Sequence, residues 1–132
     1  MLKTAAIIFG VFFIIAGIGG FVPALAPAMG DGRMLFGIFM VGPVHNMIHL
    51  ASGAAALFCA FAGAGAARKY FQIFGVVYLL VALIGFVYGN SPIMGVMEHN
   101  NADIGLHIAI AAVALYFGFV GSRDVTEAGT RA

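Results

Sequence analysis

Charged side chains are scarce in this chain of 132 residues, because Asp, Glu, Lys and Arg together make up 8% of it. In soluble domains about a quarter of the residues are charged. A chain of this length cannot supply a polar shell for a composition that is 63% hydrophobic. The composition therefore excludes an ordinary soluble domain, and the six Lys and Arg residues form no basic patch for nucleic acid.

Cysteine is also rare, and common catalytic motifs are missing. The single cysteine, Cys59, excludes an intrachain disulfide and a metal site built on paired thiolates, so we expect it to be a small packing residue. The chain has no Gly-rich phosphate loop, no nucleotide motif and no Ser/His/Asp set. We therefore assign no catalytic residue.

What the chain has instead is four long stretches without a charge. Each can hold the ~20 residues that cross a hydrocarbon layer ~30 Å thick. We predict an all-α fold, a four-helix transmembrane bundle that occupies residues 1–132 as a single integral membrane domain. The predicted spans are about 4–22, 43–64, 70–89 and 104–122.

The N-terminal segment resembles a signal peptide. Lys3 and an apolar run precede Ala24-Leu25-Ala26, a triplet of the kind found at cleavage sites. We nevertheless expect this segment to be retained as the first span, because it recurs within the chain as the third span.

Two parts of the chain repeat each other. Residues 9–22, FGVFFIIAGIGGFV, have the same first three residues and the same last three residues as residues 74–87, FGVVYLLVALIGFV. Residues 49–58, HLASGAAALF, match residues 107–116, HIAIAAVALY, including the initial histidine. The pattern predicts two tandem two-helix hairpins, about 1–66 and 67–132, related by a pseudo-two-fold axis along the membrane normal.

Basic residues are distributed unevenly around the predicted spans. Arg33 falls on one side, and the other five fall on the opposite side: Lys3, Arg68, Lys69, Arg123 and Arg131. Because cytoplasmic loops are enriched in Lys and Arg, this asymmetry predicts that both termini are cytoplasmic. The opposite, outer side then carries Asp31, Glu98, Asp103 and all four histidines.

The connections between the spans differ in length. Between the first two spans, residues 34–40 (MLFGIFM) are expected to lie along the membrane interface as an amphipathic or re-entrant piece. In the centre of the chain, Gly63, Gly65, Arg68 and Lys69 predict a short polar turn before the third helix.

The clearest functional pattern begins at Pro43 and reads PVHNMIHL. His45 and His49 are four residues apart, so they project from one face of a helix. The repeat-equivalent positions are Asp103 and His107. Two such pairs on symmetry-related helices would bring three imidazoles and a carboxylate to a common axis. Imidazole with carboxylate suits zinc, iron or copper, and two opposed histidines suit a haem iron.

The sequence therefore offers two readings of these residues. In the first they bind a cofactor: His45, His49, Asp103 and His107 are candidate ligands of a transition metal, and His49 with His107 is the candidate pair for haem. In the second they are structural. Asp103 is then the N-cap of the fourth helix, and His49 bridges the hairpins by hydrogen bonding to His107 or Asn46.

Four segments resemble a known family: GGFVP, PVHNMIHLASG, YFQIFGVVYLLVALIGFV and NNADIGLHIAIA. This family of small four-helix bacterial membrane proteins is defined only as a domain of unknown function. The similarity covers roughly residues 9–116, and its most specific residues are His45, Asn46, His49, Asp103 and His107. The resemblance implies four spans and a multi-pass location in the bacterial inner membrane, and it implies no activity.

Three classes of function remain open. The first is a non-enzymatic binding or accessory module, in contact with the lipid bilayer and either with further copies of itself or with a larger membrane complex. The second is a membrane redox or metal-dependent enzyme. The third is a transporter subunit, which the shortage of ionisable residues within the spans disfavours. We favour the binding or accessory module.

Overall fold

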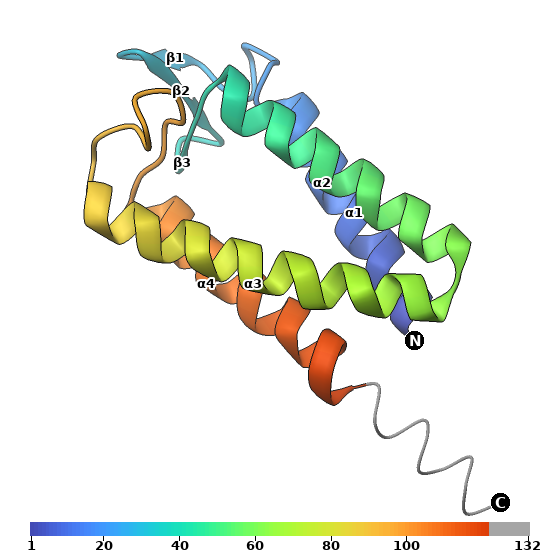
Figure 1. The fold of residues 1–132 in the computed structure, drawn as a ribbon. Helices are drawn as coiled ribbons and strands as arrows, with labels where there is room; N and C mark the ends of the chain where they lie inside the picture. The colour runs from blue at the N-terminus through green and yellow to red at the C-terminus, as the bar shows by residue number, and fades with distance from the viewer. Residues whose placement is uncertain (122–132) are drawn as a thin grey trace, which may run out of the picture.

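The computed structural model describes residues 1–121, which are mostly helical (Figure 1). Each of its four main helices is long and apolar enough to cross a membrane, the fourth together with the π-helix η1 that continues it. This confirms the predicted number of helices and a multi-pass membrane protein. The helices are α1 (Leu2–Gly19), α2 (Pro43–Ala62), α3 (Ala64–Tyr88), α4 (Asn101–Leu115) and η1 (Tyr116–Val120). Arg123 and Arg131, which entered the orientation argument, lie outside the described residues.

Large apolar side chains cover the outside of the bundle. Phe58 on α2 is 74% exposed and Val87 on α3 is 85% exposed. In water, an apolar surface of this extent would drive aggregation, whereas lipid chains solvate it without cost. The exposed faces of the helices therefore fit contact with the bilayer.

Glycine lets the first two helices approach closely. α1 packs mainly on α2, and α3 packs mainly on α4. At the first contact Gly10 lies against Gly53, and a Cβ added to Gly53 would be 2.8 Å from the backbone oxygen of Gly10. Close approach of backbones through small residues is the usual way in which membrane helices associate.

We expect Gly53→Ala to lower the free energy of unfolding by about 1–3 kcal/mol, the cost of overpacking. The added methyl group would meet backbone atoms of Gly10 and Ile14, which cannot move aside as a flexible side chain can. Gly105→Ala on α4 is the matched control, because a Cβ there meets nothing within 4 Å. Thermal unfolding in detergent measures both variants, and equal melting temperatures would contradict the close contact of α1 with α2.

The connection between α1 and α2 forms a small antiparallel sheet. β1 (Ala28–Met29) pairs with β2 (Gly32–Leu35), and β2 pairs with β3 (Phe39–Val41). The expectation of an amphipathic or re-entrant piece at residues 34–40 was wrong. Gly30 and Gly37 adopt positive φ angles of 59° and 70° in the two connections, so the chain reverses twice and its backbone groups pair with each other.

The link between α2 and α3 is tighter than predicted. α2 ends at Ala62, Gly63 has a φ of 131°, and α3 begins at Ala64. Gly65, Arg68 and Lys69 are therefore helical, and the prediction that they form a polar turn was wrong. A single glycine reverses the chain, because the absence of a Cβ permits a backbone angle that other residues avoid.

The two ends of the bundle differ in character. The strands β1–β3 and the loop of residues 89–100 lie together at one end, which we call the sheet end (Figure 1). The N-terminus and the turn at Gly63 lie at the other end. α2 and α4 both begin at the sheet end, so their first turns face the loops.

Candidate metal centre

Three histidines meet inside the bundle near its sheet end. His45 and His49 come from the first two turns of α2, and His107 comes from α4. They are 1%, 7% and 5% exposed, respectively. One nitrogen of each ring lies within 4.8 Å of the others. We call this group the histidine triad.

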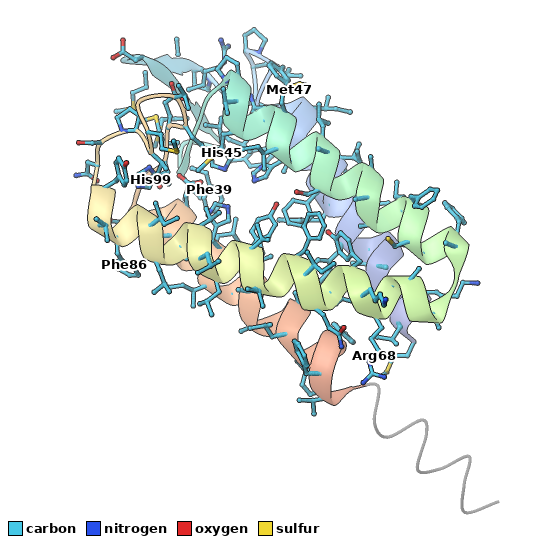
Figure 2. The ribbon with its side chains drawn as sticks, in the orientation of Figure 1. Phe39, His45, Met47, Arg68, Phe86 and His99 are labelled. Carbon is cyan, nitrogen blue, oxygen red and sulfur yellow. The ribbon has the colours of Figure 1, made fainter. Side chains whose placement is uncertain are left out.

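The local sequence explains why the rings of the triad converge. Pro43 occupies the first turn of α2, where it has no hydrogen bond to lose and its fixed φ suits the helix. The spacing of four residues then puts His45 and His49 on one face, with ring centroids 4.5 Å apart. Figure 2 shows His45 directed into the bundle and Met47 directed outward. The ring of His107 lies 5.6 Å from that of His45 and 6.2 Å from that of His49.

A hydrogen bond orients the ring of His45. Its Nδ1 lies 2.9 Å from the backbone oxygen of Glu98. Because a carbonyl can only accept, Nδ1 carries the proton and Nε2 carries the lone pair. This Nε2 and the Nδ1 of His49 are buried and have no hydrogen-bond partner among the described residues. A histidine held through one nitrogen by a carbonyl, with the other nitrogen free, has the arrangement typical of a metal ligand.

Aromatic rings hold the other two histidines. Phe13 of α1 packs on His49 with ring centroids 5.5 Å apart, and Tyr78 of α3 packs on His107 at 5.3 Å. The hydroxyl of Tyr78 donates to Ser52 Oγ over 2.9 Å. Sequence reasoning missed this role of Phe13 and Tyr78, although the first repeat aligns these two positions with each other.

Asp103 is buried beside the triad but does not belong to it. Its Oδ2 accepts the backbone N–H groups of Asn100 and Met40, each over 2.9 Å. The side chain of Asn100 in turn accepts from the backbone N–H of Asp103, which completes a capping box. The N-cap of α4 is thus Asn100 rather than Asp103, and Asp103 is the third residue of the helix and the last of the capping box. Its role as a metal ligand stays a prediction.

His49 and Asn46 are not joined by a hydrogen bond in the described part of the chain, and neither are His49 and His107. Asn46 is fully buried against Gly20, the C-cap of α1, and both polar atoms of its side chain lack a partner among the described residues. The bridging role that the sequence left open for His49 therefore has no hydrogen bond to carry it here.

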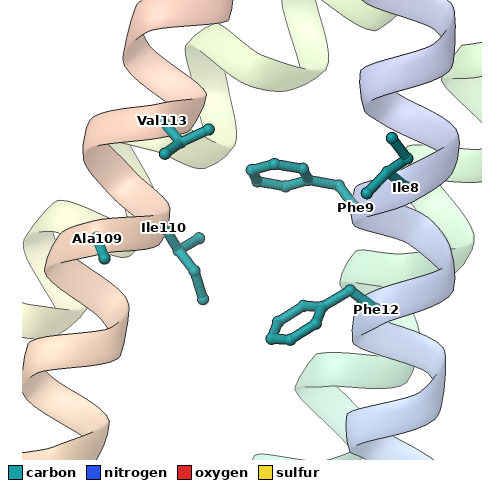
Figure 3. Close-up of a pocket in the computed structure, with 6 residues that line it drawn as sticks. All are labelled: Ile8, Phe9, Phe12, Ala109, Ile110 and Val113. Carbon is teal, nitrogen blue, oxygen red and sulfur yellow. The ribbon is translucent and has the colours of Figure 1, made fainter.

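Two cavities lie between α1 and α4. The larger, of about 290 Å³, is entirely apolar and is lined by Phe9 and Phe12 from α1 and by Ile110 and Val113 from α4 (Figure 3). The smaller has a volume of about 70 Å³ and includes His49 and Asp103 in its lining. Phe12 and Ile110 line both. The small cavity places open space next to the triad.

Comparison with known proteins gives a family and no activity. No curated protein and no solved structure matches the chain. One family, described as a domain of unknown function (DUF4383), matches residues 3–120, which include the four helices and the histidine triad. The match confirms the resemblance stated from the sequence, and this chain belongs to the DUF4383 family.

Proposed function

We propose that this protein is a small membrane-embedded binding or accessory module that holds one divalent transition metal of the zinc class in its histidine triad. The observation that carries the proposal is the meeting of three buried imidazoles, two of which have a nitrogen without a hydrogen-bond partner in the part of the chain that the structure describes. A buried polar atom without a partner costs about 1–3 kcal/mol. A bound metal offsets this cost because it accepts the lone pairs directly.

The geometry of the triad supports a tetrahedral ion. Zinc binds histidine nitrogens at ~2.0–2.1 Å, so two ligands at a tetrahedral centre lie ~3.3 Å apart. One nitrogen of each ring lies within 4.8 Å of the others, so the proposal requires the three rings to move closer together around the ion. The 70 Å³ cavity beside His49 has room for a water molecule as the fourth ligand, since water fills about 30 Å³ in the liquid.

The same cavity makes a metal-dependent enzyme the second candidate. Catalytic zinc typically has three protein ligands and one position open to water or substrate. Asp103 lines the small cavity, so its carboxylate would lie near that open position. The accessory role remains our first proposal, because the carboxylate of Asp103 already accepts two backbone N–H groups.

A metal ion suits the site better than haem does. Haem would need the slot between His49 and His107, but His45 is packed against both rings. The adjoining cavity of about 70 Å³ is far smaller than a macrocycle. A transporter is disfavoured because the core at the other end of the bundle is apolar, with Ala5, Ala56 and Phe71 among its buried residues.

The proposal includes the internal duplication, which would relate His49 and His107 by a pseudo-two-fold axis. Equivalent contacts in the two hairpins support it. Gly10 packs on Leu57 in the first hairpin, and Gly75 packs on Leu115 in the second. The contact of Phe13 with His49 likewise corresponds to that of Tyr78 with His107.

We further propose that both termini face the cytoplasm of a bacterial cell and that the triad lies in the outer half of the inner membrane. Lys3, Arg68 and Lys69 at the end opposite the sheet end support this orientation. Reporter fusions after Ala132 and in the loop at Asn90 are expected to report opposite sides, the former cytoplasmic. A periplasmic signal from the fusion at Ala132 would contradict this orientation.

Titration with cobalt tests the metal site. We expect the metal-free protein in detergent to bind one Co²⁺ tightly, with visible absorption bands of a tetrahedral ion, and Zn²⁺ to displace it. The absence of saturable tight binding by either ion would overturn the proposed function. An octahedral spectrum would instead indicate that the ion is not held by the three imidazoles in a tetrahedral site.

A further inference from the structure

A polar pocket, separate from the histidine triad, lies at the sheet end. Its volume is about 210 Å³, and strand, turn and loop residues line it. We call it the sheet-end pocket. Its polar and sulfur-bearing lining consists of Asp31, Met40, Asn90, Glu98 and His99, together with the exposed Met29. No Lys or Arg belongs to this lining.

Two residues of this lining, Glu98 and His99, each carry a hydrogen-bond acceptor that has no partner among the described residues. His99 is 5% exposed, and its Nε2 lies 3.2 Å from the backbone oxygen of Gly85. Since a carbonyl only accepts, this Nε2 carries the proton and Nδ1 carries the lone pair. Nδ1 of His99 and Oε2 of Glu98 are buried without a hydrogen-bond partner among the described residues. Both atoms are closed to water in this structure, so they reach an ion in the pocket only when the two side chains turn toward it. A lone-pair nitrogen and a carboxylate oxygen suit a cation and disfavour an anion.

Glu98 forms the wall between this pocket and the triad. Its side chain lines the pocket, and its backbone oxygen accepts the hydrogen bond from His45 Nδ1 over 2.9 Å. His45 and His99 lie at the same end of the bundle (Figure 2). Glu98 therefore contacts both the sheet-end pocket and the triad.

We propose that the sheet-end pocket is a loading site, which takes a hydrated divalent transition metal through Glu98 and His99 and passes it to the histidine triad. This inference rests on the proposed function. The volume of 210 Å³ accommodates an ion with several of its waters, at about 30 Å³ for each water. The potential ligands of the pocket do not converge as closely as the three nitrogens of the triad do. Binding is accordingly weaker and exchangeable, as release to the triad requires.

The experiment compares equilibrium binding with the rate of loading, for the full chain in detergent. Wild-type protein is expected to bind two Zn²⁺, one tightly and one weakly. His99→Gln keeps a donor for the Gly85 carbonyl but is a poor metal ligand, and Glu98→Gln removes the charge. Each variant should lose the weak site and fill the triad about tenfold more slowly, measured by Co²⁺ absorption in stopped flow, with the tight affinity unchanged. Asn101→Ala, exposed at the start of α4, is the control.

The outcomes separate this inference from the proposed function. His49→Ala should abolish tight binding and leave the weak site intact. If wild type lacks a tight site but keeps a weak one that His99→Gln removes, the proposed function fails and a cation site in the pocket stands, without its loading role. If both pocket variants still bind two Zn²⁺ and load at the wild-type rate, the loading site is refuted. Loss of the weak site with unchanged loading would refute transfer to the triad.

Discussion

His49→Ala and His107→Ala are each expected to lower the affinity for Zn²⁺ by roughly a hundredfold to a thousandfold. Structural zinc contributes about 10–16 kcal/mol of binding free energy, so one of four ligands accounts for about 2.5–4 kcal/mol. The helices should remain packed, because the cores around Phe71 and Ala56 lie elsewhere in the bundle. Competition with a chromophoric chelator measures the affinity.

The fourth histidine supplies the matched control for this test. His99 lies outside the triad, so His99→Gln should leave the tight affinity unchanged. His49→Gln sharpens the comparison, because an amide keeps a polar side chain at the site but is a poor ligand for a transition metal. Wild-type affinity in His49→Ala would exclude His49 as a ligand. A purely structural histidine would instead change stability alone, through its packing against Phe13 and His45.

Asp103→Ala is expected to lower the free energy of unfolding by about 2–5 kcal/mol. The carboxylate accepts from the half-buried backbone N–H groups of Met40 and Asn100, and its loss leaves both without this partner. Each such group costs about 1–3 kcal/mol, and loss of a helix cap costs about 1 kcal/mol. Asp103→Asn keeps one oxygen acceptor and should lose less. Thermal unfolding in detergent measures both, with Asn101→Ala as the control.

The same variants decide whether Asp103 is also a metal ligand. If it only positions β3 and α4, the Zn²⁺ affinity of folded Asp103→Asn protein should stay within about tenfold of the wild type, the lower end of effects from groups next to a metal site. A decrease as large as that of His49→Ala would assign Asp103 to the ligands, as the sequence pattern proposed. Unchanged unfolding of Asp103→Ala would contradict the capping box.

The sequence alone was sufficient to predict the four helices and the residues of the triad. Length and apolar composition set the number of spans, because a helix must cross the hydrocarbon layer with few charged residues. The spacing of His45 and His49 put them on one face, because helical geometry relates residues four apart. The match of His107 to His49 in the repeat indicated that α4 contributes the third ring.

The tertiary structure alone decided what surrounds the triad. The roles of Asp103 and Glu98 depend on hydrogen bonds that join residues far apart in the chain, 63 positions from Asp103 to Met40 and 53 from Glu98 to His45. Helical periodicity carries no information about such contacts, since they depend on how the sheet and the loop of residues 89–100 fold over the helix ends. Local patterns therefore determined which residues could meet, and long-range packing determined which of their atoms have no hydrogen-bond partner among the described residues.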